Sequence, residues 1–152
     1  MTAKEHENKA FSLQMGKDFK SAIAEYTEAI KLEPNSGAYY GLRGQCYEGL
    51  EQSENALADY DKSISLNPKE GSTFFSRAQT YIALGEMEKA KADIEKAVEL
   101  NSEKAGQYYF GFGSKIEKLT GDKREAAVYL KKSVEHGDYN DWAKEQLAEW
   151  GM

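Results

Sequence analysis

An eleven-residue phrase recurs along this 152-residue chain at a constant interval. "AEYTEAIKLEP" occupies residues 24–34, "ADYDKSISLNP" occupies 58–68 and "ADIEKAVELNS" occupies 92–102. Each copy begins 34 residues after the previous one. A fixed period of this length is typical of repeat architectures, in which every copy forms the same unit of supersecondary structure. The period therefore constrains the fold more than any other feature of the chain.

The residues around the phrase also repeat. Aligning the three copies divides the chain into windows 3–36, 37–70 and 71–104. Small, aromatic and aliphatic residues then share positions: Ala10, Leu13, Ala22, Tyr26, Ile30 and Leu32 in the first window, Tyr40, Gly44, Tyr47, Ala56, Tyr60, Ile64 and Leu66 in the second, and Phe74, Ala78, Tyr81, Ala90, Ile94, Val98 and Leu100 in the third. The first half of the first window is the weakest, because His6 and Lys9 stand where apolar residues are expected.

A fourth, slightly longer copy covers about residues 105–138. Its first half matches the third window at an offset of 35, through Tyr109 and Gly113, and its second half matches at an offset of 36, through Ala126 and Leu130. We therefore expect one added residue before residue 109 and another in the turn around "LTGDK". Both are placed in loops because short insertions cost little there.

Each window contains two apolar stripes at helical spacing, with a short polar turn between them. In the second window the first stripe is Tyr40, Gly44, Tyr47 and Leu50, and the second is Ala56, Leu57, Tyr60, Ile64 and Leu66. Small residues such as Gly44 and Ala56 would let the two helices approach closely. Pro34 and Pro68 follow the second stripe, where a proline ends a helix because it lacks an N–H and clashes with the preceding turn. The sequence predicts an all-α chain of helix–turn–helix units.

This pattern resembles the tetratricopeptide repeat, whose 34-residue signature places aromatic, small and proline residues at fixed positions. The resemblance covers about residues 3–138 in four copies, with three departures: Arg43 and Arg77 stand at the usual leucine position, and Ser102 replaces the proline. It implies an α-α superhelix, a solenoid of stacked antiparallel helix pairs forming a single domain over residues 1–152. Such stacks present a concave face lined by the first helix of each pair.

Residues 140–150, "NDWAKEQLAEW", predict a final amphipathic helix with Ala143, Leu147 and Trp150 on one face. Terminal units of repeat stacks need a polar outer face, which Lys144 and its neighbours supply here. We interpret this segment as a capping helix. The alternative is that Trp142 and Trp150 form a binding patch.

Charge and composition exclude several classes of partner. The net charge is −6, and no basic stripe interleaved with aromatic residues occurs, so nucleic acid is not expected as a partner. No apolar run approaches membrane-spanning length, which argues against a membrane protein. The N-terminus, "MTAKEHENKAF", has no apolar signal region, and the single cysteine, Cys46, cannot form an intramolecular disulfide. We therefore expect a cytoplasmic protein.

No arrangement of residues predicts catalysis, a cofactor or a metal site. "GFGSK" at 111–115 resembles a phosphate-binding loop, but such loops follow a strand, and this segment lies within a predicted helix. Its glycines are better explained by close helix packing. Cys46 is interpreted as a structural thiol, and His6 and His136, in the first and last repeats, make no catalytic pair. No His or Cys cluster has metal-ligand spacing, so we predict a non-enzymatic protein without a cofactor.

Two arginine–aspartate pairs share a spacing of 16 residues: Arg43 with Asp59, and Arg77 with Asp93. Each arginine lies on a first helix and each aspartate on the following second helix. We interpret them as ion pairs that tie neighbouring helices together. The alternative is that the arginines face a ligand carboxylate.

The candidate peptide-binding residues are the groove-facing positions of the first helices. They are Asn8, Phe11, Leu42, Gln45, Phe75, Gln79, Ile82, Phe110 and Ser114. This mixture suits a peptide whose side chains fill apolar pockets while amide side chains bond its backbone. The alternative for Phe75 and Phe110 is packing between adjacent repeats.

One specific partner can be tested on these positions. Related modules that capture the C-terminal carboxylate of heat-shock chaperones hold it with Lys, Asn and Arg. The matching positions here hold Glu7, Phe11, Leu42, Ser72 and Ser76, none of which fits. Lys4 and Asn8 would fit only if the first helix slid by three residues. A chaperone tail is therefore disfavoured.

The function expected is a protein–protein interaction adaptor or scaffold that binds an unidentified peptide or protein in its concave groove. The alternative is a self-assembling structural module that oligomerises through the weak first repeat or the C-terminal helix. We expect a monomer or a weak homo-oligomer, and a monomer at every concentration would exclude the self-assembling module.

Overall fold

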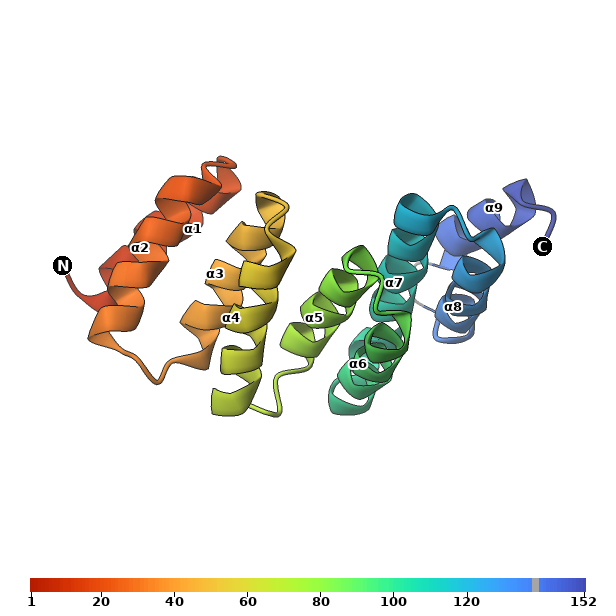
Figure 1. Cartoon of the computed structure of the whole chain (residues 1–152). Helices are drawn as coiled ribbons and strands as arrows, with labels where there is room; N and C mark the ends of the chain where they lie inside the picture. The colour runs from red at the N-terminus through yellow and green to blue at the C-terminus, as the bar shows by residue number, and fades with distance from the viewer. Residues whose placement is uncertain (138–139) are drawn as a thin grey trace. The chain divides into compact units, whose positions relative to one another are not determined.

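A computed structural model describes residues 1–137 and 140–152 of the chain, and in these residues it contains helices and no strand (Figure 1). The helices are α1 (Ala3–Met15), α2 (Phe19–Leu32), α3 (Gly37–Gly49), α4 (Ser53–Leu66), α5 (Gly71–Ala83), α6 (Met87–Leu100), the short 3₁₀ helix η1 (Ser102–Lys104), α7 (Ala105–Thr120), α8 (Lys123–Glu135) and α9 (Asn140–Glu149). The predicted all-α fold class is confirmed. The chain divides into two compact units, Met1–Ser76 and Arg77–Met152, which are described separately.

The first unit contains two complete helix pairs, α1 with α2 and α3 with α4, and the first six residues of α5. Helices joined by such short turns run antiparallel, as Figure 1 shows for both pairs. Ala10, Ala22 and Tyr26 are fully buried between α1 and α2, and Cys46 of α3 packs onto them. The repeated small and aromatic residues therefore form the contact within a pair and also the contact to the next pair.

The turn inside each helix pair contains one residue in the left-handed conformation. These residues are Lys17 (φ 62°), Glu51 (φ 57°), Gly85 (φ 76°) and Gly121 (φ 70°). Glycine adopts this conformation without a steric penalty, whereas a residue with a Cβ does not. The first two repeats therefore hold a strained residue at a position where the last two hold glycine.

In the second unit the fourth repeat accommodates its added residues differently from our expectation. Helix α8 begins 36 residues after α6, as the offset predicted, but the connection before α7 is no longer than the one before α5. Instead α7 has 16 residues where α5 has 13, and it continues to Thr120 before Gly121 ends it. The prediction that both additions lie in loops is wrong, because each residue added to a helix end gains a backbone hydrogen bond that a loop residue lacks.

Helix α9 packs against the fourth repeat as the predicted cap. Ala143 and Leu147 are buried against Ala127 and Leu130 of α8, and Trp150 lies at the edge of the same cluster. Trp142 is 62% exposed, and its ring centroid lies 6.2 Å from that of Phe110. Trp150 therefore packs against the cluster, whereas Trp142 lies largely at the surface beside Phe110. Residue 138, the last of the predicted fourth repeat, lies outside the described residues.

Candidate functional site

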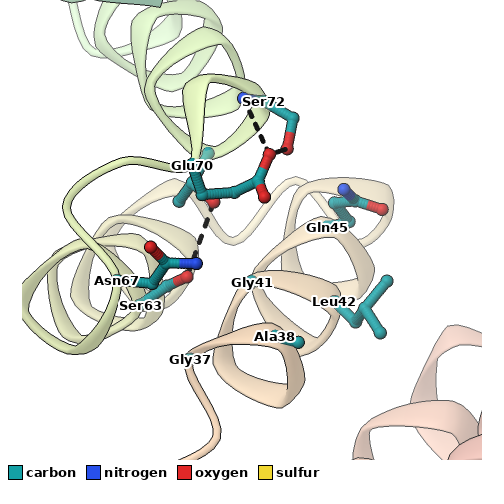
Figure 2. Close-up of a pocket in the computed structure, with 10 residues that line it drawn as sticks. Gly37, Ala38, Gly41, Leu42, Gln45, Ser63, Asn67, Glu70 and Ser72 are labelled. Atoms are coloured by element: carbon teal, nitrogen blue, oxygen red, sulfur yellow. Dashed lines mark hydrogen bonds between the residues drawn. The ribbon is translucent and has the colours of Figure 1, made fainter. Parts of the chain in front are cut away.

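An open pocket of about 250 Å³ lies in the first unit, where α3, the end of α4 and the start of α5 meet (Figure 2). Three segments line it: Gly37, Ala38, Gly41, Leu42 and Gln45 from α3, Ser63 and Asn67 from α4 and its C-terminal cap, and Glu70, Ser72 and Thr73 from the loop and the first turn of α5. The pocket thus opens between two successive repeats.

Small residues on α3 form the inner wall of this pocket. A Cβ at Gly37 would lie 3.0 Å from the carbonyl oxygen of Ser63, and one at Gly41 would lie 3.3 Å from the Ser63 hydroxyl. Helix α3 therefore approaches α4 along its glycines. The Ser63 hydroxyl lies 3.5 Å from the Thr73 hydroxyl, which links α4 to α5 beneath the pocket. Because these residues are short, the space above them is not filled by side chains.

The rim of the pocket contains one carboxylate, that of Glu70. Its Oε1 accepts hydrogen bonds from the hydroxyl (2.6 Å) and the backbone N–H (3.4 Å) of Ser72. These bonds hold the carboxylate at the N-terminus of α5, where the helix dipole favours negative charge. Figure 2 shows Glu70 and Ser72 together at one end of the pocket, across from Leu42 and Ala38. None of the residues lining the pocket is a lysine or an arginine.

Two of the predicted groove residues, Leu42 and Gln45, line this pocket. The Gln45 Oε1 accepts a hydrogen bond of 3.3 Å from Nε2 of Gln14 on α1, and the Gln14 Oε1 in turn accepts one of 2.9 Å from the Tyr26 hydroxyl. This chain of bonds orients the Gln45 amide. Its Nε2 group has no hydrogen-bond partner among the described residues and is available to a ligand.

The other predicted groove residues of the first unit lie outside the pocket lining. Asn8 and Phe11 are exposed on α1, and the Phe11 side chain is 52% accessible. Phe75 is half-buried on α5. The first unit therefore presents an exposed aromatic side chain on α1 in addition to the pocket.

In the second unit the predicted residues have different environments. Ile82 is buried, whereas Gln79 and Ser114 are half-buried. The Phe110 ring packs against the cluster between α8 and α9, with its centroid 6.2 Å from that of Trp142. Phe110 therefore contributes to attachment of the capping helix.

Eight of the ten residues lining the pocket were not among the predicted groove residues, and three of these, Ser63, Asn67 and Glu70, lie outside the first helices. We assigned the groove to first helices only, whereas Ser63 lies on a second helix and Asn67 and Glu70 lie in the loop between repeats. The loop sequences differ between repeats, "EPNS" at 33–36, "NPKE" at 67–70 and "NSEK" at 101–104, and this variation was the available signal.

The two arginine–aspartate pairs are ion pairs between the helices of one repeat. Arg43 donates from Nε and Nη2 to the two Asp59 oxygens at 2.8 and 2.7 Å, and from Nη1 to the Thr27 hydroxyl at 3.1 Å. Arg77 makes the same two-pronged contact with Asp93, at 2.7 and 2.9 Å. The hydrogen bonds to Asp59 raise the pKa of Arg43 further above its ordinary value. These contacts support the structural interpretation of both arginines.

The remaining candidate chemical groups have structural environments. Cys46 is fully buried, and burial raises the pKa of its thiol to about 11, so the thiol is protonated at neutral pH. "GFGSK" lies inside α7, where a Cβ at Gly113 would be 2.9 Å from the Ala126 carbonyl oxygen. Among residues 1–137 and 140–152, no three His, Cys, Asp or Glu side chains are grouped to hold a metal ion. Within the same ranges, no helix has both the length and the apolar character needed to cross a bilayer.

Comparison with known proteins identifies the repeats. The family model of the tetratricopeptide repeat matches residues 37–70 and 72–104. Similar solved structures include a crystal structure of MamA, at 19% identity and a TM-score of 0.75, covering 91% of this chain and 80% of that one. Two others are the first and second TPR of Spaghetti (RPAP3), each bound to the HSP90 peptide SRMEEVD. The first has 21% identity and a TM-score of 0.66, covering 86% of this chain and 94% of that one, and the second has 22% and 0.65, covering 66% and 94%.

No curated protein sequence matches the chain. The repeat match and the shared fold nevertheless agree with the 34-residue period and the helix pairs described above. Residues 37–70 and 72–104 are tetratricopeptide repeats, and the chain shares the helical-repeat fold of the similar solved structures.

Proposed function

We propose that this protein is a non-enzymatic interaction module that binds an extended peptide segment of a partner protein across α3 and the start of α5. The observation that carries the proposal is the open pocket beside Gln45, whose amide N–H groups are oriented by Gln14 and available to a ligand. Concave pockets with apolar walls and a few fixed polar groups are the usual form of a ligand site.

The composition of the surface supports a peptide over other ligands. The apolar side chains of Leu42 and Phe11 are accessible for a peptide's own side chains, while the amides of Gln45 and Asn67 can bond its backbone. This combination of apolar anchors and amides suits an extended chain, which exposes N–H and C=O groups along its length. The solved structures of Spaghetti (RPAP3) repeats contain a bound peptide, and the shared fold gives this chain the same kind of scaffold.

A chaperone tail remains a disfavoured partner. Helix α1 begins 34 residues before α3, so the three-residue slide that would bring Lys4 and Asn8 into the carboxylate-binding positions is absent. The Lys4 ammonium is also engaged, because its Nζ lies 2.8 Å from the Glu7 carboxylate.

The test is binding of a random heptapeptide library to the full chain, compared with the Gln45→Ala variant and with Gln52→Ala as a control. Gln52 is an exposed glutamine of the same unit and lies outside the pocket. We expect Gln45→Ala to lose affinity for the selected peptides by about tenfold, as removal of a ligand hydrogen bond typically does. Equal affinities for all three proteins would exclude the pocket as the peptide site, and failure to select any peptide would contradict the proposed function.

Self-assembly through the C-terminal helix is a second candidate. A shallow apolar hollow of about 370 Å³ lies between α8 and α9, lined by Val134, Leu147 and Met152 with Lys131, Glu135, Lys144 and Ala148 around them. Light scattering during size-exclusion chromatography tests it directly. A mass that stays at one chain over a hundredfold range of concentration would eliminate this candidate.

A further inference from the structure

We propose that the pocket between α3 and α5 selects a peptide with a lysine side chain, whose ammonium group binds the Glu70 carboxylate. The inference rests on the proposed function, because it specifies which residue of a bound peptide enters the pocket. It follows from three properties of the pocket: the sign of its charge, the apolar character of the opposite wall, and the one free oxygen of Glu70.

The charge of the pocket is negative. Glu70 is the one charged residue among the ten that line it. Arg43 of α3 is engaged by both oxygens of Asp59, and Lys69, which precedes Glu70 in the chain, does not line the pocket. The first unit as a whole has twelve acidic and eight basic residues. A ligand carboxylate would therefore be repelled, and a cation would be attracted.

The walls of the pocket fit the two parts of a lysine side chain. Leu42 and Ala38 lie on α3, across the pocket from Glu70, and offer apolar surface to a four-carbon stem (Figure 2). Glu70 lies at the rim, where an ammonium group can reach it and remain partly hydrated. Lysine commonly buries its stem against apolar surface while its charged end stays in water.

The hydrogen bonds of Glu70 favour lysine over arginine. Oε1 already accepts two bonds from Ser72, while Oε2 has no partner among the described residues. An ammonium group is a compact charge and needs only one acceptor oxygen. A guanidinium binds a carboxylate best through two parallel bonds, which here would compete with Ser72 for Oε1. The pocket therefore offers the single-oxygen contact that suits lysine.

The test uses acetylated and amidated heptapeptides whose central residue is lysine, arginine, norleucine or glutamate, bound to the full chain and followed by fluorescence anisotropy. Because acetylation and amidation remove the terminal charges, the peptides differ in charge only at the central side chain. We expect the lysine peptide to bind about tenfold more tightly than the norleucine peptide, as a charge-assisted hydrogen bond would provide. The difference should shrink as salt is raised.

Variants of the pocket separate charge from packing. Glu70→Gln should bind lysine and norleucine peptides equally, and Glu70→Lys should prefer the glutamate peptide. Ser72→Ala removes the shorter of the two bonds to Oε1, that of the hydroxyl, and should improve arginine relative to lysine. Glu54→Gln removes one charge from an exposed position of α4 outside the pocket and should behave like the wild type. Circular dichroism of each variant establishes that it is folded.

The possible failures are distinguishable. Equal binding of the lysine and norleucine peptides to the wild type, or an unchanged lysine preference in Glu70→Gln, would overturn the lysine inference while leaving peptide binding in place. If no heptapeptide binds, whatever its central residue, the proposed function fails and the inference fails with it.

Discussion

The duplicated arginine–aspartate pair makes the clearest stability prediction. In Arg43→Ala the Asp59 carboxylate, whose side chain is only 8% exposed, loses both of its guanidinium hydrogen bonds. The Thr27 hydroxyl also loses a donor, and the stacking of the guanidinium on the Tyr40 and Tyr47 rings, at 5.6 and 6.0 Å, is removed. The variant therefore leaves a nearly buried negative charge without its partner.

The magnitude follows from the burial of the pair. Removing one partner of a buried ion pair costs about 3–5 kcal/mol. The Arg43 side chain is 17% exposed, so water can reach the vacated space, and we expect the lower end, about 3 kcal/mol. For a chain of this size each kcal/mol shifts the unfolding midpoint by about 2–4 °C, which gives a decrease of roughly 9 °C. Arg43→Lys should lie between wild type and alanine, because one ammonium cannot make the two parallel bonds.

The assay is thermal and urea unfolding followed by circular dichroism. Replacing both partners, in Arg43→Leu with Asp59→Leu, should recover most of the lost stability, since the double variant has no unpaired buried charge. Arg77→Ala provides an independent repetition at the equivalent pair. The reasoning would be refuted if both alanine variants kept the wild-type midpoint, and loss of peptide binding in such variants would assign the arginines to the ligand instead.

Three further predictions concern single positions. Glu51→Gly should stabilise the protein by about 0.5 kcal/mol, because removing the steric strain of a Cβ in the left-handed conformation (φ 57°) outweighs the added flexibility of the unfolded chain; a lower urea midpoint would contradict this. Gly85→Ala, at an equivalent left-handed position (φ 76°), should instead destabilise the protein. Gly113→Ala should destabilise by about 1 kcal/mol, since overpacking against the Ala126 carbonyl oxygen at 2.9 Å exceeds the gain in helix propensity, and an unchanged urea midpoint would show that α7 and α8 can separate at this point. Hydrogen bonds from Lys9 and, to a smaller extent, His6 lower the pKa of Glu25 below its ordinary value of 4.5, so the ionised carboxylate stabilises the fold above that pH and this stabilisation is lost as the pH falls through the folded-state pKa. Unfolding midpoints measured from pH 6 to 3 should therefore fall more steeply for the wild type than for Glu25→Gln. Parallel curves would show that Glu25 does not link stability to pH.

Only some of the residues that form the wall of the pocket could be predicted from the sequence. Leu42 and Gln45, which both line the pocket, could be placed on one face of α3 because helical spacing assigns each residue of a helix to a face. Glu70 could not be placed in this way, since it precedes α5 and its position depends on how the chain passes from one pair to the next. Glu70, on which the proposed lysine specificity depends, could therefore be assigned to the pocket only from the tertiary structure.

The same distinction explains the outcome for Phe110. Its position on α7 was predictable, and both a groove-facing role and packing between elements were consistent with the sequence. Its ring lies against α9, near Trp142, and that contact depends on where the last helix docks. Similarly, the residues added to the fourth repeat lengthened α7, because the place where a helix ends depends on the balance of backbone hydrogen bonds at its terminus.

The sequence by itself determined the helix pairs, their period and the small-to-aromatic contacts within each pair, and it favoured the arginine–aspartate bridges over a ligand-facing role for the arginines. These features depend on residues at fixed separations within one repeat, and the same separations recur in each 34-residue copy. Only the tertiary structure decided which exposed positions border an open pocket and which are covered by another element. That outcome depends on packing between segments whose sequences do not repeat, so no periodicity in the chain encodes it.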